Sequence, residues 1–484
     1  MPQGSRFASL DALRGLAILG MAWSGMLPET LPAWMYHAQS PPPNHQSDPT
    51  IPGVTWVDLV FPFFLFSMGA AIPLALTRRL ERGEKWFQVA WVLLIRGMLL
   101  GAFAIFGEHL RAGEWSDEPN ANTYWVVFCG FFLLVLMFIR WPQKVPPVLG
   151  KAVTAMAWIG ATLLIAFHNY PDGTRGFANY RNDVILMVLA NVAVSGGLIW
   201  LATRCRPLLR AGVMIAVMFV FLSSSAPDSL GKQIWDFTPL QFLRLDGWPY
   251  KRFFPIFYHF EYHKYLLIVL PGTFCGDLVL RSRGEDDSEG HWVWARYLAV
   301  ALLGIAASVA ACIGFYAHDD LATCWELMAI GAGMVVVTAR PLTSAQRLIS
   351  QLVRFGAAIL FLGLLALPLD GGIKKDEATL GYFLVTAGLA TLFLAALQSL
   401  TEGLKLERWL RAFTYPGMNP ILAYCTITNF VMGLSGLTRY SELLGLGPLY
   451  PKPWVLAVVD GGLKTLVVAF VAAICTERAI FLRT

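Results

Sequence analysis

The sequence predicts an all-α fold, a polytopic membrane bundle of about 14 spanning helices (about 10 to 14 in range). Only 14% of the 484 residues are charged and 56% are apolar, whereas soluble proteins carry about a quarter charged residues. Mean hydropathy is +0.56. Uncharged apolar runs recur along the whole chain, each near the roughly 20 residues that cross a bilayer as a helix. Lipid admits only helices and closed barrels, and these runs lack a barrel's short alternating segments.

The predicted spans follow one another with short polar connections. They lie near 8–28, 53–77, 87–107, 122–139, 149–168, 183–202, 208–225, 262–280, 293–315, 320–339, 349–368, 379–399, 413–435 and 454–476. The span at 320–339 is weaker because it contains Glu326. The longest polar insert is 223–262, and 282–291 is expected to be a solvated linker. No soluble domain interrupts the series, so residues 1–484 are expected to form a single transmembrane domain.

Lysine and arginine gather in alternate connections, which indicates the side that faces the cytoplasm. These cations are Arg78, Arg79, Arg82, Lys85, Arg140, Lys144, Lys151, Arg204, Arg206, Arg210, Arg281, Arg283, Arg340, Arg347, Lys405, Arg408, Arg411, Arg478 and Arg483. The opposite connections hold isolated cations, apart from Lys374–Lys375 and the long insert. An even number of spans then places both termini in the cytoplasm, with loop 28–52 and insert 223–262 facing outward.

Two kinds of ligand are not expected from the composition. The net charge is +5, but no basic block is dense enough for nucleic acid. None of the seven cysteines forms a CxxC pair, and no HExxH or other recognised ligand spacing occurs, so no metal site is predicted.

The first outward loop carries candidates for acid–base chemistry. It contains His37 and His45 and several prolines, which predict a defined, extended shape because proline fixes φ. Asp58 follows at the start of the next span, where a carboxylate is costly unless it is paired or hydrated. A histidine beside such a helix end can act as base or nucleophile near neutral pH. The alternative is an ordinary loop histidine and a helix-capping aspartate.

A second polar cluster, YHFEYHK at 258–264, precedes the eighth span. Glu261, Tyr262 and His263 suit a sugar site, because carboxylates accept hydrogen bonds from hydroxyls and aromatic rings stack on sugars. In a helix, Glu261 and His263 would not share a face. The alternative is an interfacial belt of tyrosine, histidine and lysine.

Charged residues within the spans are candidates for function or for packing. Asp11 and Arg14 have i,i+3 spacing, and Asp460 and Lys464 have i,i+4 spacing, so each pair is expected to neutralise itself. Arg96, Asp277 and Glu326 have no evident local partner.

Several motifs together resemble a known family. They are SLDALRGLAILGM at 9–21, YHA at 36–38, TWVDLVFPFFLFSMG at 55–69, EATLGYFLVTAGLA at 377–390 and FTYPGMNPILAY at 413–424. In this order they resemble the heparan-alpha-glucosaminide N-acetyltransferase family of transmembrane acyltransferases, and within it the bacterial NagX-like branch. The chain differs from the pattern at Gly25, where the family has asparagine, and at 425–429 (CTITN), where it has GHE.

The resemblance implies a multi-pass protein of the bacterial inner membrane that transfers an acetyl group from cytoplasmic acetyl-CoA. The acceptor is the amine of glucosamine, or of a glucosamine-containing saccharide, on the periplasmic side. The family's catalytic histidine corresponds to His37, with Asp58 beside it; His45 is the rival because it is nearer Asp58 in sequence. His45, Glu261, Tyr262 and His263 are then candidates to bind the sugar.

Coenzyme A needs cations for its phosphates, and the cytoplasmic helix ends supply them. Arg14, Tyr415 and Asn419 are the candidates to line its passage, since Pro416 and Gly417 break the helix start and free backbone N–H groups for an anion. The alternatives are pairing of Arg14 with Asp11 and an ordinary helix entry. The expected partners are the lipid bilayer, acetyl-CoA and the amino sugar, and a homodimer is compatible with this interpretation.

Two other functions remain open from the sequence. An amino-sugar or oligosaccharide transporter also needs many spans and intramembrane charges, although the halves show none of the self-similarity that inverted repeats would give. An acyltransferase acting on another surface glycan would use the same chemistry.

Overall fold

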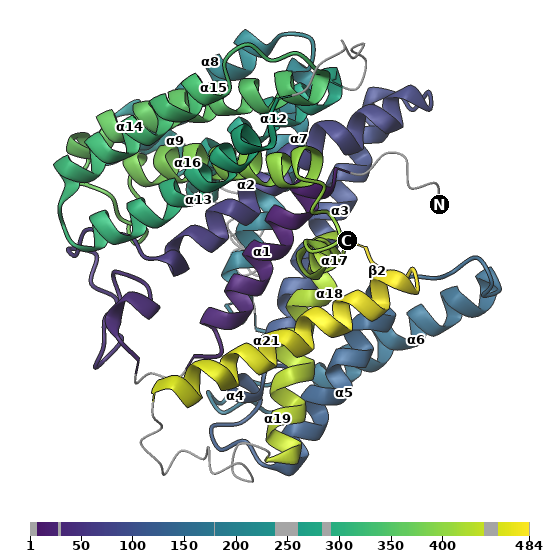
Figure 1. Ribbon diagram of the computed structural model, residues 1–484. Helices are drawn as coiled ribbons and strands as arrows, with labels where there is room; N and C mark the ends of the chain where they lie inside the picture. Colours follow the sequence, from purple (N-terminus) through teal and green to yellow (C-terminus); the bar gives the residue numbers. More distant parts are fainter. Residues whose placement is uncertain are drawn as a thin grey trace.

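The computed structural model describes residues 7–27, 31–178, 180–237, 260–282, 292–439 and 454–483 (Figure 1). The chain is an all-α polytopic membrane protein: within these residues, 12 helical segments are long and apolar enough to cross a membrane. They comprise α2 (Trp56–Glu81), α3 (Trp86–His109), α5 (Ala121–Phe138), α6 (Pro147–Ala166), α7 (Val184–Thr203), α12 (Leu266–Ser282) with its preceding turn, α13 (Trp294–Tyr316), α14 (Asp320–Val337), α15 (Ser344–Ala366), α16 (Leu380–Gln398), α18–α19 (Pro420–Thr438) and α21 (Trp454–Glu477).

Every predicted span corresponds to a helix. The predicted spans at 8–28 and 208–225, which are not among the 12 long segments, correspond to the shorter helices α1 (Ala8–Ser24) and α8 (Pro207–Ser223), each of 17 residues. Short elements complete the described chain: η1 (Ala33–Met35), α4 (Ala112–Trp115), α9 (Leu230–Trp235), η2 (Phe260–Tyr265), η3 (Leu367–Leu369), the π-helical turn η4 (Ser399–Gly403), α17 (Arg411–Met418), and the strands β1 (Ile139–Arg140) and β2 (Phe481–Leu482). Much of insert 223–262, and residues 283–291 of the expected linker, lie outside the described residues.

Helix α1 occupies the centre of the bundle, between α12–α16 on one side and α5, α6 and α19 on the other (Figure 1). It packs against α2 and α17. Two glycines permit the contact with α17. A Cβ added to Gly417 would lie 1.8 Å from the Asp11 carbonyl oxygen, and one added to Gly15 would lie 1.7 Å from that of Phe413. The two backbones therefore touch, and larger side chains would separate them.

Helix α16 is buried on nearly every side: all of its residues except Phe393 are buried. A helix that is apolar all round belongs in a protein interior, and α16 packs against α2, α12, α13 and α15. Because α16 is held in this position, it also determines where the preceding loop, residues 370–379, lies.

The predicted span at 413–435 is a broken helix. Asn419 interrupts it between α17 and α18 (Pro420–Cys425), and the π-helical turn η5 (Thr426–Val431) leads into α19 (Met432–Thr438). Such π turns often occur at functional sites. The break is secured by the C-terminal strand: Asn419 Nδ2 donates to the Ile480 carbonyl at 2.8 Å, and its Oδ1 accepts from Leu482 N at 3.2 Å.

The charged residues within the spans are paired as predicted in two cases. Arg14 lies 3.3 Å from Asp11, and Lys464 lies 3.1 Å from Asp460. Asp277, for which the sequence offered no local partner, pairs across helices with Arg210 at 2.6 Å. Arg210 was expected to be a loop cation, but its side chain is fully buried in the first turn of α8. All seven cysteines are free thiols.

Candidate functional site

A cavity of about 920 Å³ lies at one end of the bundle. It is lined by Met21, Ser24, Gly25, Met26, His37, Ser47, Pro49, Val57, Val60, Phe61, Arg111, Ala112, Gly113, Val184, Ile185, Val188, Glu261, Lys264, Tyr265, Lys375, Asp376, Glu377, Ala378, Tyr424, Ile427, Thr428 and Met432. Most of these residues stand where α1 and α3 end and where α2, α7, α12 and α16 begin. Since successive spans are antiparallel, these termini share the end that the loop charges predict to face outward.

His37 and Asp58 meet in the wall of this cavity. His37 Nδ1 lies 2.6 Å from Asp58 Oδ1. The Asp58 carboxylate is fully buried, whereas the His37 side chain is 37% exposed and lines the cavity. A carboxylate can only accept hydrogen bonds, so this contact assigns the ring proton to Nδ1 and leaves the lone pair of neutral imidazole on Nε2.

The other oxygen of Asp58 is held by the backbone. Asp58 is the third residue of α2, and its Oδ2 accepts from Thr55 N at 2.9 Å, as in a capping box, and from Ala38 N at 3.1 Å. A buried carboxylate close to a helix N-terminus is favoured by the free N–H groups there. The capping role and the histidine partnership, which the sequence offered as alternatives, coexist in one side chain.

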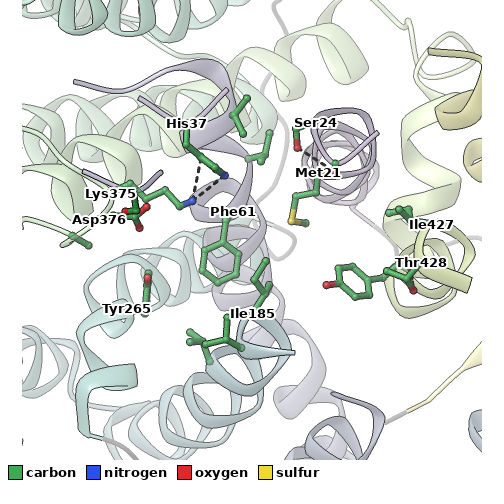
Figure 2. Close-up of a pocket in the computed structure, with 18 of the residues that line it drawn as sticks. Met21, Ser24, His37, Phe61, Ile185, Tyr265, Lys375, Asp376, Ile427 and Thr428 are labelled. Atoms are coloured by element: carbon green, nitrogen blue, oxygen red, sulfur yellow. Dashed lines mark hydrogen bonds between the residues drawn. The ribbon is translucent and has the colours of Figure 1, made fainter. Parts of the chain in front are cut away.

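Lys375 joins this pair from the loop before α16. Its Nζ lies 3.1 Å from both Nδ1 and Nε2 of His37, although the residues are 338 positions apart (Figure 2). One hint of this residue was visible in the sequence, because Lys374–Lys375 stood out among the cation-poor outward loops. Nothing in the sequence indicated its contact with His37.

The loop that carries His37 is well defined but folded through turns, so the expected extended shape is wrong. Ser40 N donates to the His37 carbonyl at 3.0 Å, and His45 N donates to that of Pro41 at 3.2 Å. The ring of His45 packs edge-on against Tyr36, with centroids 4.5 Å apart. Among the described residues, His37 is the histidine that lines the cavity and contacts Asp58.

The second predicted cluster reaches the cavity in part. In the 3₁₀ helix η2, residues three apart align, and Lys264 Nζ lies 3.0 Å from Glu261 Oε1. Glu261 and Lys264 line the cavity; Tyr262 packs against the apolar core, and the ring of His263 lies against Phe260. The Glu261–Lys264 pair was not predicted from the sequence, although i,i+3 spacing brings side chains together in α- and 3₁₀-helices alike.

Arg111 and Tyr424 form the opposite part of the lining. The Arg111 guanidinium lies 3.0 Å from Glu108 and 2.7 Å from Asp183, and Tyr424 donates a hydrogen bond to Asp183. Burial disfavours the charged guanidinium, but Tyr424 and the two carboxylates outweigh burial and raise the pKa of Arg111 above its ordinary value. The sequence did not reveal this cluster, because its members come from three distant helices.

The residues proposed for coenzyme A lie at the other end of the bundle. Arg14 donates to the carbonyls of Gly417 and Ser67, each at 3.1 Å, so it joins α1, α17 and α2. The Asn419 amide is bonded to the C-terminal segment, and the Tyr415 carbonyl accepts from Thr476. The structure therefore groups Arg14 with the 415–419 segment but does not bring either of them to the His37 cavity.

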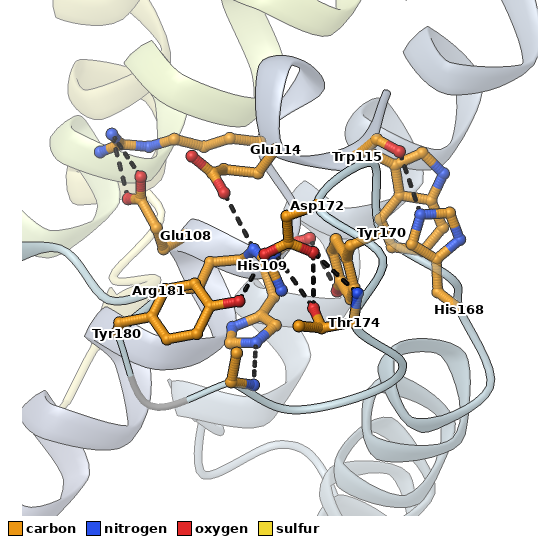
Figure 3. A network of polar contacts seen from close by, with 12 residues as sticks. Glu108, His109, Glu114, Trp115, His168, Tyr170, Asp172, Thr174, Tyr180 and Arg181 are labelled. Atoms are coloured by element: carbon orange, nitrogen blue, oxygen red, sulfur yellow. Dashed lines mark hydrogen bonds and ion pairs between the residues drawn. The ribbon is translucent and has the colours of Figure 1, made fainter. Parts of the chain in front are cut away.

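A second polar network centres on Arg181, and Figure 3 shows it from close by. Arg181, only 2% exposed, bonds Glu114 at 2.9 Å and Asp172 at 2.7 Å. Hydrogen bonds from Thr174 and Tyr180 hold the pKa of Asp172 well below its ordinary value. This network fixes the loop between α6 and α7 against α4, which supplies Ala112 and Gly113 to the cavity.

Two further results bear on classification. Among the described residues, no group of three or more histidine, cysteine, aspartate or glutamate side chains could hold a metal ion. The sequence profile of a domain of unknown function, DUF5009, matches residues 6–279, more than half of the chain. The chain belongs to the DUF5009 family. Comparison with curated proteins finds no significant match.

The DUF5009 region contributes His37, Asp58, Arg111 and Glu261 to the site. Lys375 and the 424–432 part of the lining come from beyond it. Gly25 and Thr428, which lie at the two departures from the resembled motifs, both line the cavity. The differences therefore fall where a bound molecule would be contacted.

Proposed function

We propose that this DUF5009 protein is an acetyltransferase that moves an acetyl group from cytoplasmic acetyl-CoA to the amine of glucosamine, or of a glucosamine-containing saccharide, across the membrane. The observation that carries the proposal is the buried Asp58 carboxylate, 2.6 Å from Nδ1 of His37. It orients the ring and leaves Nε2 as the basic nitrogen of a residue that lines the cavity. This is the arrangement that general-base and nucleophilic histidines require.

Two routes use the same nitrogen. In the direct route, the amine attacks the thioester carbonyl, the C–N bond forms, the C–S bond breaks, and His37 Nε2 passes the amine proton to the departing thiolate. In the two-step route, Nε2 attacks first and thiolate leaves; the amine then attacks the acetyl group, the bond between the acetyl carbon and Nε2 breaks, and the amine proton passes to the freed Nε2. In both routes Asp58 stabilises the positive charge that develops on the ring.

The remainder of the cavity supports an amino sugar as acceptor. A volume of about 920 Å³ is within the usual range for small-molecule sites. Glu261 offers a carboxylate for hydroxyl or ammonium groups, and Phe61 and Tyr265 offer ring surfaces that pack edge to face, with centroids 5.6 Å apart. Tyr262, His263 and His45 lie next to these elements, and under the proposal their contribution is to shape the acceptor site.

The loop charges support the proposed direction of transfer. The cavity occupies the end of the bundle whose loops are poor in lysine and arginine, and Arg14, Tyr415 and Asn419 stand toward the cation-rich end. Under the proposal the protein lies in the bacterial inner membrane with both termini in the cytoplasm. The donor enters near Arg14, and its thioester must then reach His37.

Release of free coenzyme A thiol tests the proposal. Purified protein in nanodiscs, given acetyl-CoA and glucosamine, should release thiol and form N-acetylglucosamine. His37→Ala should abolish the release, while His318→Asn, a change at an outward histidine whose left-handed φ of 60° asparagine tolerates, should leave it within about twofold. Unchanged release by His37→Ala would refute the assignment. Uptake of labelled glucosamine into proteoliposomes without acetyl-CoA would favour a transporter instead.

A further inference from the structure

Among the described residues, Lys375 is the cavity cation that has no carboxylate oxygen within ion-pair distance. The Arg111 guanidinium lies between Glu108 and Asp183, and Lys264 is paired with Glu261. In the described part of the chain, Lys375 makes no ion pair with a carboxylate; its Nζ instead lies 3.1 Å from each ring nitrogen of His37. An ammonium group next to the reactive nitrogen, and not neutralised by a carboxylate contact, is available to a negative charge that forms there.

Hydrogen bonds connect the backbone around Lys375 to the loop that carries His37. Lys375 N donates to Oε1 of Gln39 at 3.3 Å, and Gln39 is fully buried. The side-chain nitrogen Nε2 of Gln39 donates to the carbonyls of Ile51 and Gly53, each at 3.0 Å. Gly53 N donates in turn to the Ile373 carbonyl at 2.7 Å. Contacts on both sides of the lysine therefore fix its position against the loop.

Helix α16, which follows the Lys375 loop, also supports Asp58. Thr379 caps α16 and accepts from Lys374 N at 3.1 Å, which closes the loop on the helix. One turn further, the Tyr382 hydroxyl donates to the Asp58 carbonyl at 2.8 Å. Helix α16 is buried, so it holds Lys375 and Asp58 in place relative to each other and to the imidazole.

Acyl transfer creates a negative charge on the former carbonyl oxygen. That oxygen is bonded to the carbon that reacts at or beside His37 Nε2, so it forms within reach of a group already 3.1 Å from Nε2. Positioned donors at such an oxygen stabilise the transition state strongly, because they need no reorganisation during the reaction.

We propose that Lys375 is a catalytic residue whose ammonium stabilises the tetrahedral oxyanion formed in acyl transfer at His37. The inference rests on the proposed acetyltransferase function and applies equally to its direct and two-step routes. In the resting site the Lys375 ammonium lies 3.1 Å from both ring nitrogens of His37; on donor binding it donates a hydrogen bond to the acyl oxygen. When the C–S bond breaks, the oxyanion returns to a carbonyl.

Substitutions on one loop test this role in the CoA-release assay. Lys375→Met should lower kcat by about 10²- to 10³-fold, the usual loss for one oxyanion donor, with a much smaller change in KM for glucosamine. Lys375→Arg should restore part of kcat. Lys374→Met is the matched control, because Lys374 does not line the cavity, and it should stay within about twofold of the parent. A Lys375→Met variant with unchanged kcat would overturn the inference.

A second measurement needs neither acetyl-CoA nor a sugar. Diethyl pyrocarbonate acylates neutral imidazole through a similar oxyanion, and mass spectrometry locates the product on His37. At the high-pH rate plateau, Lys375→Met should carbethoxylate His37 at least about tenfold more slowly than the parent. An equal or faster rate would mean that Lys375 only shields Nε2, and the inference would fail. Slow carbethoxylation in a protein that releases no coenzyme A would instead count against the acetyltransferase proposal alone.

Discussion

Asp58 Oδ1 lies 2.6 Å from His37 Nδ1, while Asp58 Oδ2 accepts two backbone N–H groups. An asparagine at position 58 cannot accept hydrogen bonds both from His37 Nδ1 and from the two backbone N–H groups. If its oxygen faces Ala38 N and Thr55 N, its NH₂ group faces Nδ1 and forces the ring proton onto Nε2. We therefore expect Asp58→Asn to lower kcat for acetyl transfer by about 10³- to 10⁴-fold, as the wrong tautomer does in related dyads.

Steady-state CoA release, with folding checked by size-exclusion chromatography, measures this effect. Asp48→Asn is the control, since the Asp48 carboxylate accepts hydrogen bonds from Thr50 in the same exposed loop. A correctly folded Asp58→Asn protein that keeps its full kcat would show that the tautomer of His37 does not matter.

The Glu261 carboxylate predicts a specific effect on acceptor binding. Glu261→Gln keeps the size of the side chain but removes the charge that pairs with Lys264 at 3.0 Å. A hydrogen bond to a charged group contributes about 1.5–3 kcal/mol, so KM for glucosamine should rise by about 10- to 100-fold with a smaller change in kcat. The matched control is Glu402→Gln, which alters an exposed pair of the same spacing with Lys405, 3.7 Å apart. Equal KM values for both variants would remove Glu261 from the acceptor site.

The buried pair of Arg210 and Asp277 predicts a loss of stability. Arg210 also donates to Thr273 at 2.9 Å, and its replacement by methionine leaves the Asp277 carboxylate with one side-chain hydrogen bond among the described residues, from Trp200. Removing one partner of a buried ion pair costs about 3–5 kcal/mol, which a denaturant titration in micelles measures. The double variant Arg210→Met/Asp277→Leu should be less destabilised than Arg210→Met alone. Arg204→Met, at an exposed position near the same helix end, should change stability by no more than about 0.5 kcal/mol.

The Asp172 network predicts a dependence of stability on pH. The pKa of Asp172 is lowered in the folded state by hydrogen bonds from Thr174 and Tyr180, so its carboxylate favours folding when it is ionised. That contribution is complete above the ordinary aspartate pKa of about 3.9 and is lost as pH falls through the lower folded value. The Tm difference between the parent and Asp172→Asn should thus be largest at pH 5 and above and shrink below about pH 4. Asp117→Asn should show no such trend; a difference independent of pH would contradict the assignment.

The fold could be predicted almost entirely from the sequence, because apolar length is a local property. Each predicted span is helical, although the one at 413–435 is broken at Asn419, and the pairs Asp11–Arg14 and Asp460–Lys464 formed because their spacing is local. The sequence did not indicate that Arg210 is buried, since its partner Asp277 comes from a helix 67 residues away. Nor did it indicate the π turns of η5, which depend on packing around a broken helix.

The part of the site that lies within one short segment of the chain could be predicted. His37 and Asp58 are 21 residues apart and flank a single loop, so their meeting followed from the chain itself. Lys375, Arg111 and Tyr424 reach the cavity only through the packing of distant helices. Proposed roles for His45, Tyr262 and His263 rested on proximity in sequence, and the structure lines the cavity with their neighbours instead.

The support that α16 gives to Asp58 has a consequence for dissecting the protein. The region matched by the DUF5009 profile ends at residue 279, yet Tyr382, which holds the Asp58 carbonyl, and Lys375 both lie about a hundred positions later in the chain. A fragment that stops after α12 would retain histidine and carboxylate but lack the helix that braces them. Expressed as two separate polypeptides split between 282 and 292, the protein should work only when both are present, which makes the second part a candidate for complementation in trans.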